Sequence, residues 1–180
     1  MSHPQESARQ ARIVSSLVPL YLVALITGAT VASAAPIIYA DSSFARVIAV
    51  AFAPFIFSFT YALIAIVASV PFQRAIVSGK FKRSLGNLIY GPRRMYGLIW
   101  TSIYYFTPLY YALLTVPFLK KVLLRGFGYK GNLDFTIYPD TWIRDLPLVN
   151  FEKGSYLSNR AAVGTNICLS DGHILVGTVS

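Results

Sequence analysis

The stretch FEKGSYLSNRAAVGTNICLSDGHILVGTVS, residues 151–180, divides into five six-residue units. Each unit opens on an apolar side chain: Phe151, Leu157, Val163, Leu169 and Leu175. A six-residue period with an apolar first position is typical of a parallel β-helix, in which three units form one triangular coil. The alternative is an antiparallel sheet, because alternating strands also place apolar residues at even spacings. We favour the β-helix, with the first-position side chains stacked inside it.

The last three units, Val163–Ser180, would form one full coil. No capping segment follows them, and an uncapped coil presents open strand edges and an apolar end. We therefore expect an incomplete β-helix whose end pairs with further coils or with another chain. The preceding residues, 126–151, combine glycine, asparagine, aspartate and proline with short β-branched and aromatic runs, which is the composition of strands and turns.

The composition of the rest of the chain indicates an integral membrane protein. The 180 residues are 55% hydrophobic and only 13% charged, whereas soluble domains are about 25% charged. The net charge is +9, but residues 131–180 hold 5 of the 7 acidic side chains and only 3 of the 16 basic ones. We therefore divide the chain into a membrane-embedded helical anchor, residues 1–130, and an incomplete β-helix domain, residues 131–180.

Three stretches of the anchor lack Asp, Glu, Lys and Arg, namely Ile13–Ala40, Val47–Gln73 and Met95–Leu119. Each exceeds the ~20 residues that a helix needs to cross the hydrocarbon layer. The first two are joined by a short link and should form a transmembrane hairpin. The first could instead be a cleaved signal, since Ala32-Ser33-Ala34 resembles a processing site, but the apolar run continues to Ala40, which favours a retained helix.

The third stretch contains Pro108 and Pro117 and many aromatic residues, among them Trp100, Tyr104, Tyr105, Tyr110 and Tyr111. Prolines interrupt helices, and Trp and Tyr favour the head-group layer. We expect a segment that is interfacial or re-entrant and does not cross. The alternative is a third transmembrane helix, which would place the C-terminal domain outside.

Basic residues set the orientation. Arg9 and Arg12 precede the hairpin, and a larger group follows it, predicted to face anionic head groups of the lipid: Arg74, Lys80, Lys82, Arg83, Arg93, Arg94, Lys120, Lys121 and Arg125. The positive-inside rule puts both ends of the hairpin, and with them the β-helix, on the cytoplasmic side of a membrane of the bacterial inner-membrane type. Nucleic acid is not an expected partner, because no nucleic-acid-reading motif accompanies the charge.

The hexads, together with VPFLKKVLLRGFGYKG, WIRDLPLVNFEKGSYLSNRAAVGTN and DGHILVGTV, carry a family resemblance. They resemble the left-handed β-helix of the hexapeptide-repeat acyltransferases, and in particular the membrane-tethered terminal module of nonribosomal peptide synthetases of the poly-lysine synthetase type. The resemblance implies acyl or aminoacyl transfer beside the membrane. It also implies a thioester donor, either acyl-CoA or a carrier protein, and a carrier protein or further copies of the chain as partners.

By the same resemblance, His173 in SDGHIL is the candidate general base, because a neutral imidazole can take the proton of an acceptor hydroxyl or amine. The alternative is a structural histidine in a turn. Asn159 and Arg160 fall at outward-facing hexad positions and are candidates for binding a phosphate or carboxylate, although a solvated face is the plainer interpretation. Arg144 and Asp145 are adjacent in the sequence and are predicted to form a local ion pair.

Other features of the sequence point to no cofactor. No metal-ligand cluster or phosphate-binding glycine loop is present in the sequence, and the single cysteine, Cys168, reads as a buried small apolar residue. The leading hypothesis is a membrane-anchored transferase that is a fragment of a longer enzyme. A non-catalytic anchor or assembly module that pairs with a partner chain is the alternative. A transporter is disfavoured, because the apolar segments contain no charge.

Overall fold

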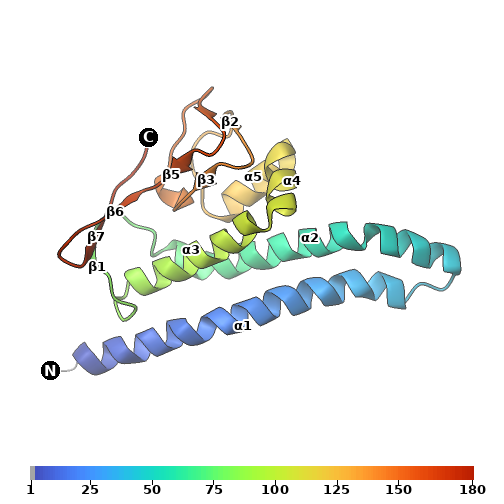
Figure 1. Ribbon diagram of the computed structural model, residues 1–180, viewed down its shortest axis with the longest axis horizontal. Helices are drawn as coiled ribbons and strands as arrows, with labels where there is room; N and C mark the ends of the chain where they lie inside the picture. Colours follow the sequence, from blue (N-terminus) through green and yellow to red (C-terminus); the bar gives the residue numbers. More distant parts are fainter. Residues whose placement is uncertain (1–2) are drawn as a thin grey trace.

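The computed structural model describes residues 3–180, and its longest feature is an antiparallel helical hairpin (Figure 1). Helix α1 spans His3–Ile38 and α2 spans Ser43–Gln73. Ser42 caps α2, because its side-chain oxygen accepts a hydrogen bond from the backbone N–H of Ala45 at 3.1 Å. The helical hairpin is therefore confirmed, and its crossing of a membrane stays a prediction.

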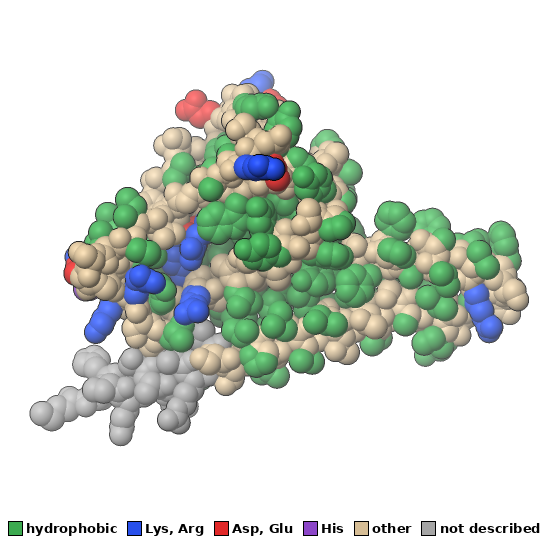
Figure 2. Space-filling view, in the orientation of Figure 1, with side chains coloured by type: hydrophobic (Ala, Val, Ile, Leu, Met, Phe, Trp, Pro, Cys, Tyr) green, Lys and Arg blue, Asp and Glu red, His purple; other side chains and the backbone are tan. Residues whose placement is uncertain are grey.

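Two segments of the described chain, Ser15–Ile38 and Ser43–Gln73, are long and apolar enough to cross a membrane. Only 17% and 11% of their most apolar windows are buried, unlike the core helix of a soluble domain. The closed end of the hairpin extends beyond the rest of the molecule and presents mainly hydrophobic side chains (Figure 2).

The third apolar stretch forms three short helices and not one long one. They are α3 (Tyr90–Tyr105), α4 (Thr107–Thr115) and α5 (Pro117–Gly126). The breaks fall at Phe106 and Val116, each next to a proline-containing first turn, where proline removes a backbone donor and disfavours a helical residue before it. The predicted interruption is confirmed, and a continuous helix over Met95–Leu119 is wrong.

The aromatic residues of this stretch divide between core and surface. Trp100 and Tyr110 are each 1% exposed, so their predicted place in a head-group belt is wrong. They pack with Tyr96 and Phe127 in the centre of the molecule, with Trp100–Phe127 ring centroids 4.9 Å apart. Tyr105 and Tyr111 remain exposed. Because side chains of a helix point in successive directions around its axis, some aromatic residues of α3 and α4 face the core while others face outward.

The C-terminal part contains short parallel strand pairs. β2 (Thr136–Ile137) pairs with β4 (Tyr156–Leu157), and β3 (Trp142–Ile143) pairs with β5 (Ala162–Val163). Both registers are offset by 20 residues, as from Ile137 to Leu157. A third parallel bridge joins Val149 to Val179, and the 3-10 turn η1 (Leu146–Leu148) precedes it. The first two pairs share one offset, which is the pattern of a chain that coils upon itself, whereas Val149 and Val179 are 30 residues apart.

The predicted single coil over Val163–Ser180 is wrong. β6 (Asn166–Cys168) and β7 (His173–Val176) form an antiparallel hairpin, and β1 (Gly79–Lys82) adds a third antiparallel strand to it. The turn between β6 and β7 contains Gly172 at φ 78°, a conformation that favours glycine. Leu175, expected inside a coil, is 45% exposed.

Side-chain contacts tie the hairpin to the remaining helices. The hydroxyls of Tyr21 and Ser102 are 2.7 Å apart, and the Gln73 amide donates to the carbonyl of Gly126 at 2.6 Å. One hydrophobic cluster runs from α1 and α2 through α3–α5 to the parallel strands. The division of the chain near residue 130 stays a prediction, and β1 shows that a strand of the proposed anchor pairs beyond that boundary.

Candidate functional site

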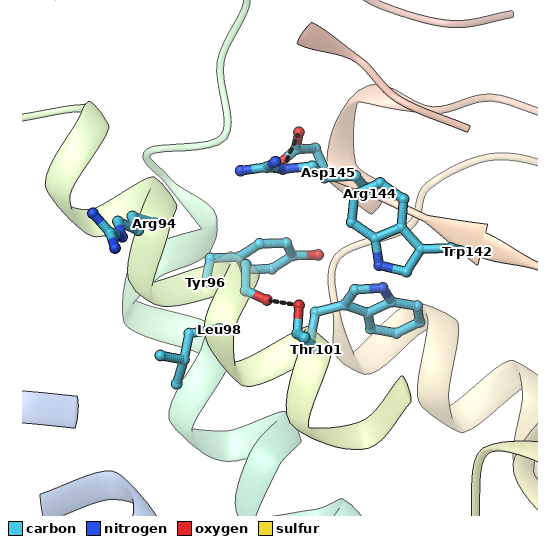
Figure 3. A pocket seen from close by; sticks show the side chains of 9 residues that line it. Arg94, Tyr96, Leu98, Thr101, Trp142, Arg144 and Asp145 are labelled. Atoms are coloured by element: carbon cyan, nitrogen blue, oxygen red, sulfur yellow. Dashed lines mark hydrogen bonds and ion pairs between the residues drawn. The ribbon is translucent and has the colours of Figure 1, made fainter. Parts of the chain in front are cut away.

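A cavity of about 280 Å³ lies between α3 and the segment that contains β3 (Figure 3). Residues of α3 form one wall and residues that follow or belong to β3 form the other. Its lining consists of Arg94, Tyr96, Gly97, Leu98, Trp100, Thr101, Trp142, Arg144 and Asp145. Both tryptophans of the chain are among them.

Behind this cavity lies a buried charged cluster. Arg93 of α3 donates a hydrogen bond through Nη2 to a carboxylate oxygen of Asp145, and also to the hydroxyl of Thr165 at 3.0 Å. The Thr165 hydroxyl donates in turn to the same oxygen of Asp145. Arg93 and Asp145 are each 1% exposed. The cluster therefore joins α3, the turn after β3 and the residue before β6.

Local conformation places Asp145 in this cluster. Asp145 adopts a left-handed backbone conformation, φ 56° and ψ 54°, directly before the 3-10 turn η1. Aspartate tolerates that region better than most residues. Burial lowers the pKa of Arg93, and the negative charge of Asp145 opposes that shift. A buried guanidinium needs such a partner, since an unpaired buried charge is strongly unfavourable.

Arg144 brings a second guanidinium to the cavity. Its Nε lies 3.7 Å from the carboxylate of Asp145, which is an ion pair but too long for a hydrogen bond. A methyl group built on Gly97 would lie 3.8 Å from Nη2 of Arg144, so the guanidinium lies over the glycine of α3. The predicted local pair of Arg144 and Asp145 exists, but Arg93 is the hydrogen-bonded partner of Asp145.

Several buried polar atoms at the site have no hydrogen-bond partner among the described residues. These atoms are Nε and Nη1 of Arg93, Nε1 of Trp100, Nε of Arg144 and Oδ1 of Asp145. The Thr101 hydroxyl, by contrast, donates to the carbonyl of Gly97 at 2.6 Å (Figure 3). Buried donors without partners are rare in folded proteins and call for an explanation.

The candidate base His173 lies elsewhere, at the start of β7 beside the turn at Asp171. Its Nδ1 is 3.1 Å from Oδ1 of Asp171, and Lys80 of β1 pairs with the other carboxylate oxygen at 2.7 Å. The His173 side chain is 36% exposed. This arrangement resembles the support of a general base by a carboxylate, but the catalytic role stays a prediction.

Asn159 and Arg160 form the turn between β4 and β5, and both are exposed. Arg160 has φ 58°. Neither residue, nor His173, lines the cavity beside Arg144. Their predicted roles in substrate binding stay predictions.

The basic residues predicted to face lipid do not behave alike. Arg93 is buried, so its assignment to a lipid surface is wrong; its ion pair with Asp145 draws it inside. Lys120 donates to the carbonyl of Phe135 at 2.7 Å and lies over that ring, and burial lowers its pKa. Arg125 is exposed but donates to the carbonyls of Tyr129 and Gly131.

The remaining members of the group are exposed, namely Arg74, Lys80, Lys82, Arg83, Arg94 and Lys121. Figure 2 shows Lys and Arg side chains gathered near the end of the molecule where β1 lies, opposite the closed end of the hairpin. The side chains of Arg9 and Arg12 lie outside the described residues.

Cys168 is exposed, so its expected burial is wrong. It belongs to β6, at an edge of the three-stranded sheet, where one face is solvated. The described residues contain no group of three or more His, Cys, Asp or Glu side chains that could hold a metal ion.

The cavity and the pairing of its two tryptophans are not predicted by the sequence. Trp100 and Trp142 are 42 residues apart in the sequence, and no local motif joins them. The one available signal was Trp142-Ile143-Arg144-Asp145, in which alternation directs Trp142 and Arg144 to the same face of a strand. Comparisons of the chain with family models, with curated proteins and with solved structures returned no match.

Proposed function

We propose that the protein is a membrane-anchored module of the β-helix transferase type, which transfers an acyl or aminoacyl group at the cytoplasmic face of a membrane. The observation that carries the proposal is the parallel pairing of β2 with β4 and of β3 with β5, combined with the apolar hairpin. The proposed fold of this part is a left-handed β-helix. Ile137, Ile143 and Val149 support it, because they are buried and lie six residues apart.

The geometry of the hairpin supports an anchor with interfacial helices. About 20 helical residues cross ~30 Å of hydrocarbon, so a span that starts at Ser43 would end near residue 63. The side chain of Phe57 packs against Phe106, at the break between α3 and α4, with ring centroids 6.2 Å apart. Phe106 would then lie about 20 Å from the closed end of the hairpin. The α3–α4 corner would enter the near side of the bilayer without crossing it.

The proposed chemistry uses His173. The neutral imidazole would take a proton from an acceptor amine or hydroxyl as that group attacks the carbonyl carbon of a thioester. The carbon–sulfur bond breaks, the acyl group passes to the acceptor, and the sulfur leaves with a proton as a free thiol. The donor would be acyl-CoA or a thioester on a carrier protein. Asp171 would hold the ring through Nδ1, which leaves Nε2 to act as the base.

The anchor is tested with the native cysteine. Cys168 is the only cysteine and is exposed, so a membrane-impermeant maleimide can label it without any substitution. We expect labelling in inverted membrane vesicles and not in intact spheroplasts. The matched variant, Cys168→Ser with Ser42→Cys in the hairpin link, should give the opposite pattern. Labelling of Cys168 from outside would overturn the orientation.

The transfer chemistry is tested by the release of free thiol from acyl-CoA and from carrier-bound thioesters, with amine and hydroxyl acceptors present. His173→Ala should lower the rate by about 10² or more, as expected for the loss of a general base. Lys153→Gln is the control, because Lys153 is exposed and pairs with Asp134, which lies outside the turn between β6 and β7. Unchanged thiol release by His173→Ala would remove the base from the proposal.

A second candidate function is a non-catalytic assembly module. The observation that favours it is that β4 and β5 each have one hydrogen-bonded neighbour among the described strands, so one edge of each strand is open. Tyr156 of β4 is 62% exposed. Open parallel edges can pair with a second copy of the chain. Light scattering in detergent tests it, since Tyr156→Lys should dissociate such an assembly while Tyr105→Lys, on exposed α3 surface, should not.

A further inference from the structure

We propose that the cavity between α3 and β3 binds the carboxylate group of a small ligand through Arg144 and Trp100. This inference concerns a different place in the molecule from His173 and does not depend on the transfer chemistry. The cavity of about 280 Å³ is large enough for a small organic acid, and its walls combine aromatic rings with polar donors.

The charges of the site favour an anion. Arg93 and Arg144 contribute two positive charges beside the cavity, whereas Asp145 contributes one negative charge, so positive charge is in excess. The Asp145 side chain is fully buried and that of Arg144 is 31% exposed, so solvent screens this excess only in part. Arg94 also lines the cavity but points away from Arg144 and Asp145 (Figure 3).

The unpartnered donors match a carboxylate. Nε1 of Trp100 is buried and has no hydrogen-bond partner within residues 3–180, on a side chain that is 1% exposed and lines the cavity. Nε of Arg144 is likewise buried and has no hydrogen bond, and it belongs to the same lining. A carboxylate offers such donors two acceptor oxygens, and its negative charge is complementary to the guanidinium of Arg144. A phosphate monoester carries more charge and a third oxygen.

The surrounding groups are already engaged and do not compete for the ligand. The Tyr96 hydroxyl donates to the carbonyl of Phe127 at 2.7 Å, and the Thr101 hydroxyl donates to Gly97. Trp142 is only half-buried, so its ring can cover the apolar part of the ligand. Gly97 leaves space beside the Arg144 guanidinium, where an alanine methyl group would lie in van der Waals contact.

Tryptophan fluorescence, excited where tyrosine absorbs little, reports on this cavity, because both tryptophans of the chain line it. The full chain in detergent is titrated with sodium benzoate and sodium acetate at constant ionic strength. Benzamide and acetamide, which match the probes in shape but carry no charge, are the controls. We expect a saturable change with the acids and none with the amides. No saturable change with either acid, or an equal response to the amides, would overturn the proposal.

Variants separate the site from general charge effects. Arg144→Gln and Arg144→Lys should each weaken benzoate binding about tenfold or more, since lysine keeps the charge but lacks the Nε donor. Lys153→Gln, an exposed control, should bind as the unchanged protein does. Trp100→Phe, followed by calorimetry, removes the indole N–H together with part of the ring and should also weaken binding. Unaltered affinity in both Arg144 variants would refute the assignment of Arg144.

Titrations with phosphate test which class of anion the cavity binds. Inorganic phosphate and vesicles that contain an anionic phospholipid replace the acids in the same titration. We expect weaker binding of inorganic phosphate than of benzoate, and no competition between vesicles and benzoate. Tighter binding of phosphate would overturn the carboxylate assignment, and displacement of benzoate by the vesicles would instead identify a lipid head group as the ligand.

Discussion

Arg93 of α3 donates a hydrogen bond to Asp145, which lies 52 residues later in the turn after β3. Both side chains are almost wholly buried, and Thr165 bonds to each of them. The pair therefore connects the helical layer to the parallel strands and fixes the wall of the proposed carboxylate site. Removing one member of such a buried pair is strongly destabilising, because the other charge is then buried without a partner.

The first prediction concerns this pair. Asp145→Asn removes the charge but keeps the shape of the side chain, and asparagine tolerates the left-handed backbone conformation of residue 145 as aspartate does. Arg93 then remains buried without a counter-charge, and we expect a loss of about 3–5 kcal/mol in the free energy of unfolding. Denaturant unfolding in detergent measures it. Asp134→Asn breaks an exposed pair with Lys153 at 3.7 Å and should cost at most about 1 kcal/mol. Equal losses in the two variants would contradict the prediction.

The second prediction concerns a buried tyrosine. The Tyr110 hydroxyl of α4 donates to the carbonyl of Thr141 at 2.8 Å, directly before β3. Tyr110→Phe leaves that carbonyl without the bond and should destabilise the protein by about 1–2 kcal/mol. Tyr105→Phe, at a residue 76% exposed, is the control and should have little effect. Burial also raises the pKa of Tyr110, so its absorbance should titrate later in alkali than that of exposed tyrosines.

The third prediction concerns the contact of α5 with α2. A methyl group at Gly126 would lie 2.6 Å from Cγ2 and 3.1 Å from Cγ1 of Ile66, which is too close. Ile66 is β-branched and cannot turn aside easily. Gly126→Ala should therefore cost about 1–3 kcal/mol in stability, measured by thermal unfolding. Gly177→Ala is the matched control, because no atom lies within 4 Å of its added methyl group. A similar shift in both variants would count against close packing at Gly126.

The fourth prediction concerns pH. The hydrogen bond from Lys80 is the main reason that the pKa of Asp171 falls from 3.8 to about 2. Because the folded-state pKa is the lower one, the stabilisation is present above 3.8 and is lost as the pH falls to about 2. Lys80→Gln should raise the midpoint toward 3.8 in a carboxyl NMR titration, whereas Lys153→Gln should not. An unmoved midpoint in Lys80→Gln would show that β1 does not hold the turn.

The β part shows where periodicity alone is ambiguous. The six-residue period correctly predicted strand positions for Leu157 in β4 and Val163 in β5. It failed at Leu169 and Leu175, because a six-residue spacing is also even and so fits an antiparallel hairpin. The hairpin forms where Asp171 and Gly172 supply a tight turn and β1 supplies a third strand. The buried residues Ile137, Ile143 and Val149 have the same spacing, but Pro139 and Pro147 between them are typical of turns and obscure the strand pattern.

Features that depend on neighbouring residues could be predicted from the sequence. The hairpin follows from two long charge-free runs and a short link, and the breaks before α4 and α5 follow from Pro108 and Pro117. Hydrophobicity and proline geometry act locally, so the linear order of residues is sufficient. Features that depend on distant partners could not be predicted. Arg93 lies inside because Asp145 and Thr165 meet it there, and Trp100 and Trp142 share a cavity because α3 packs beside β3. Burial of a charge is decided by the partner that folding brings to it, and only the tertiary structure contains that partner.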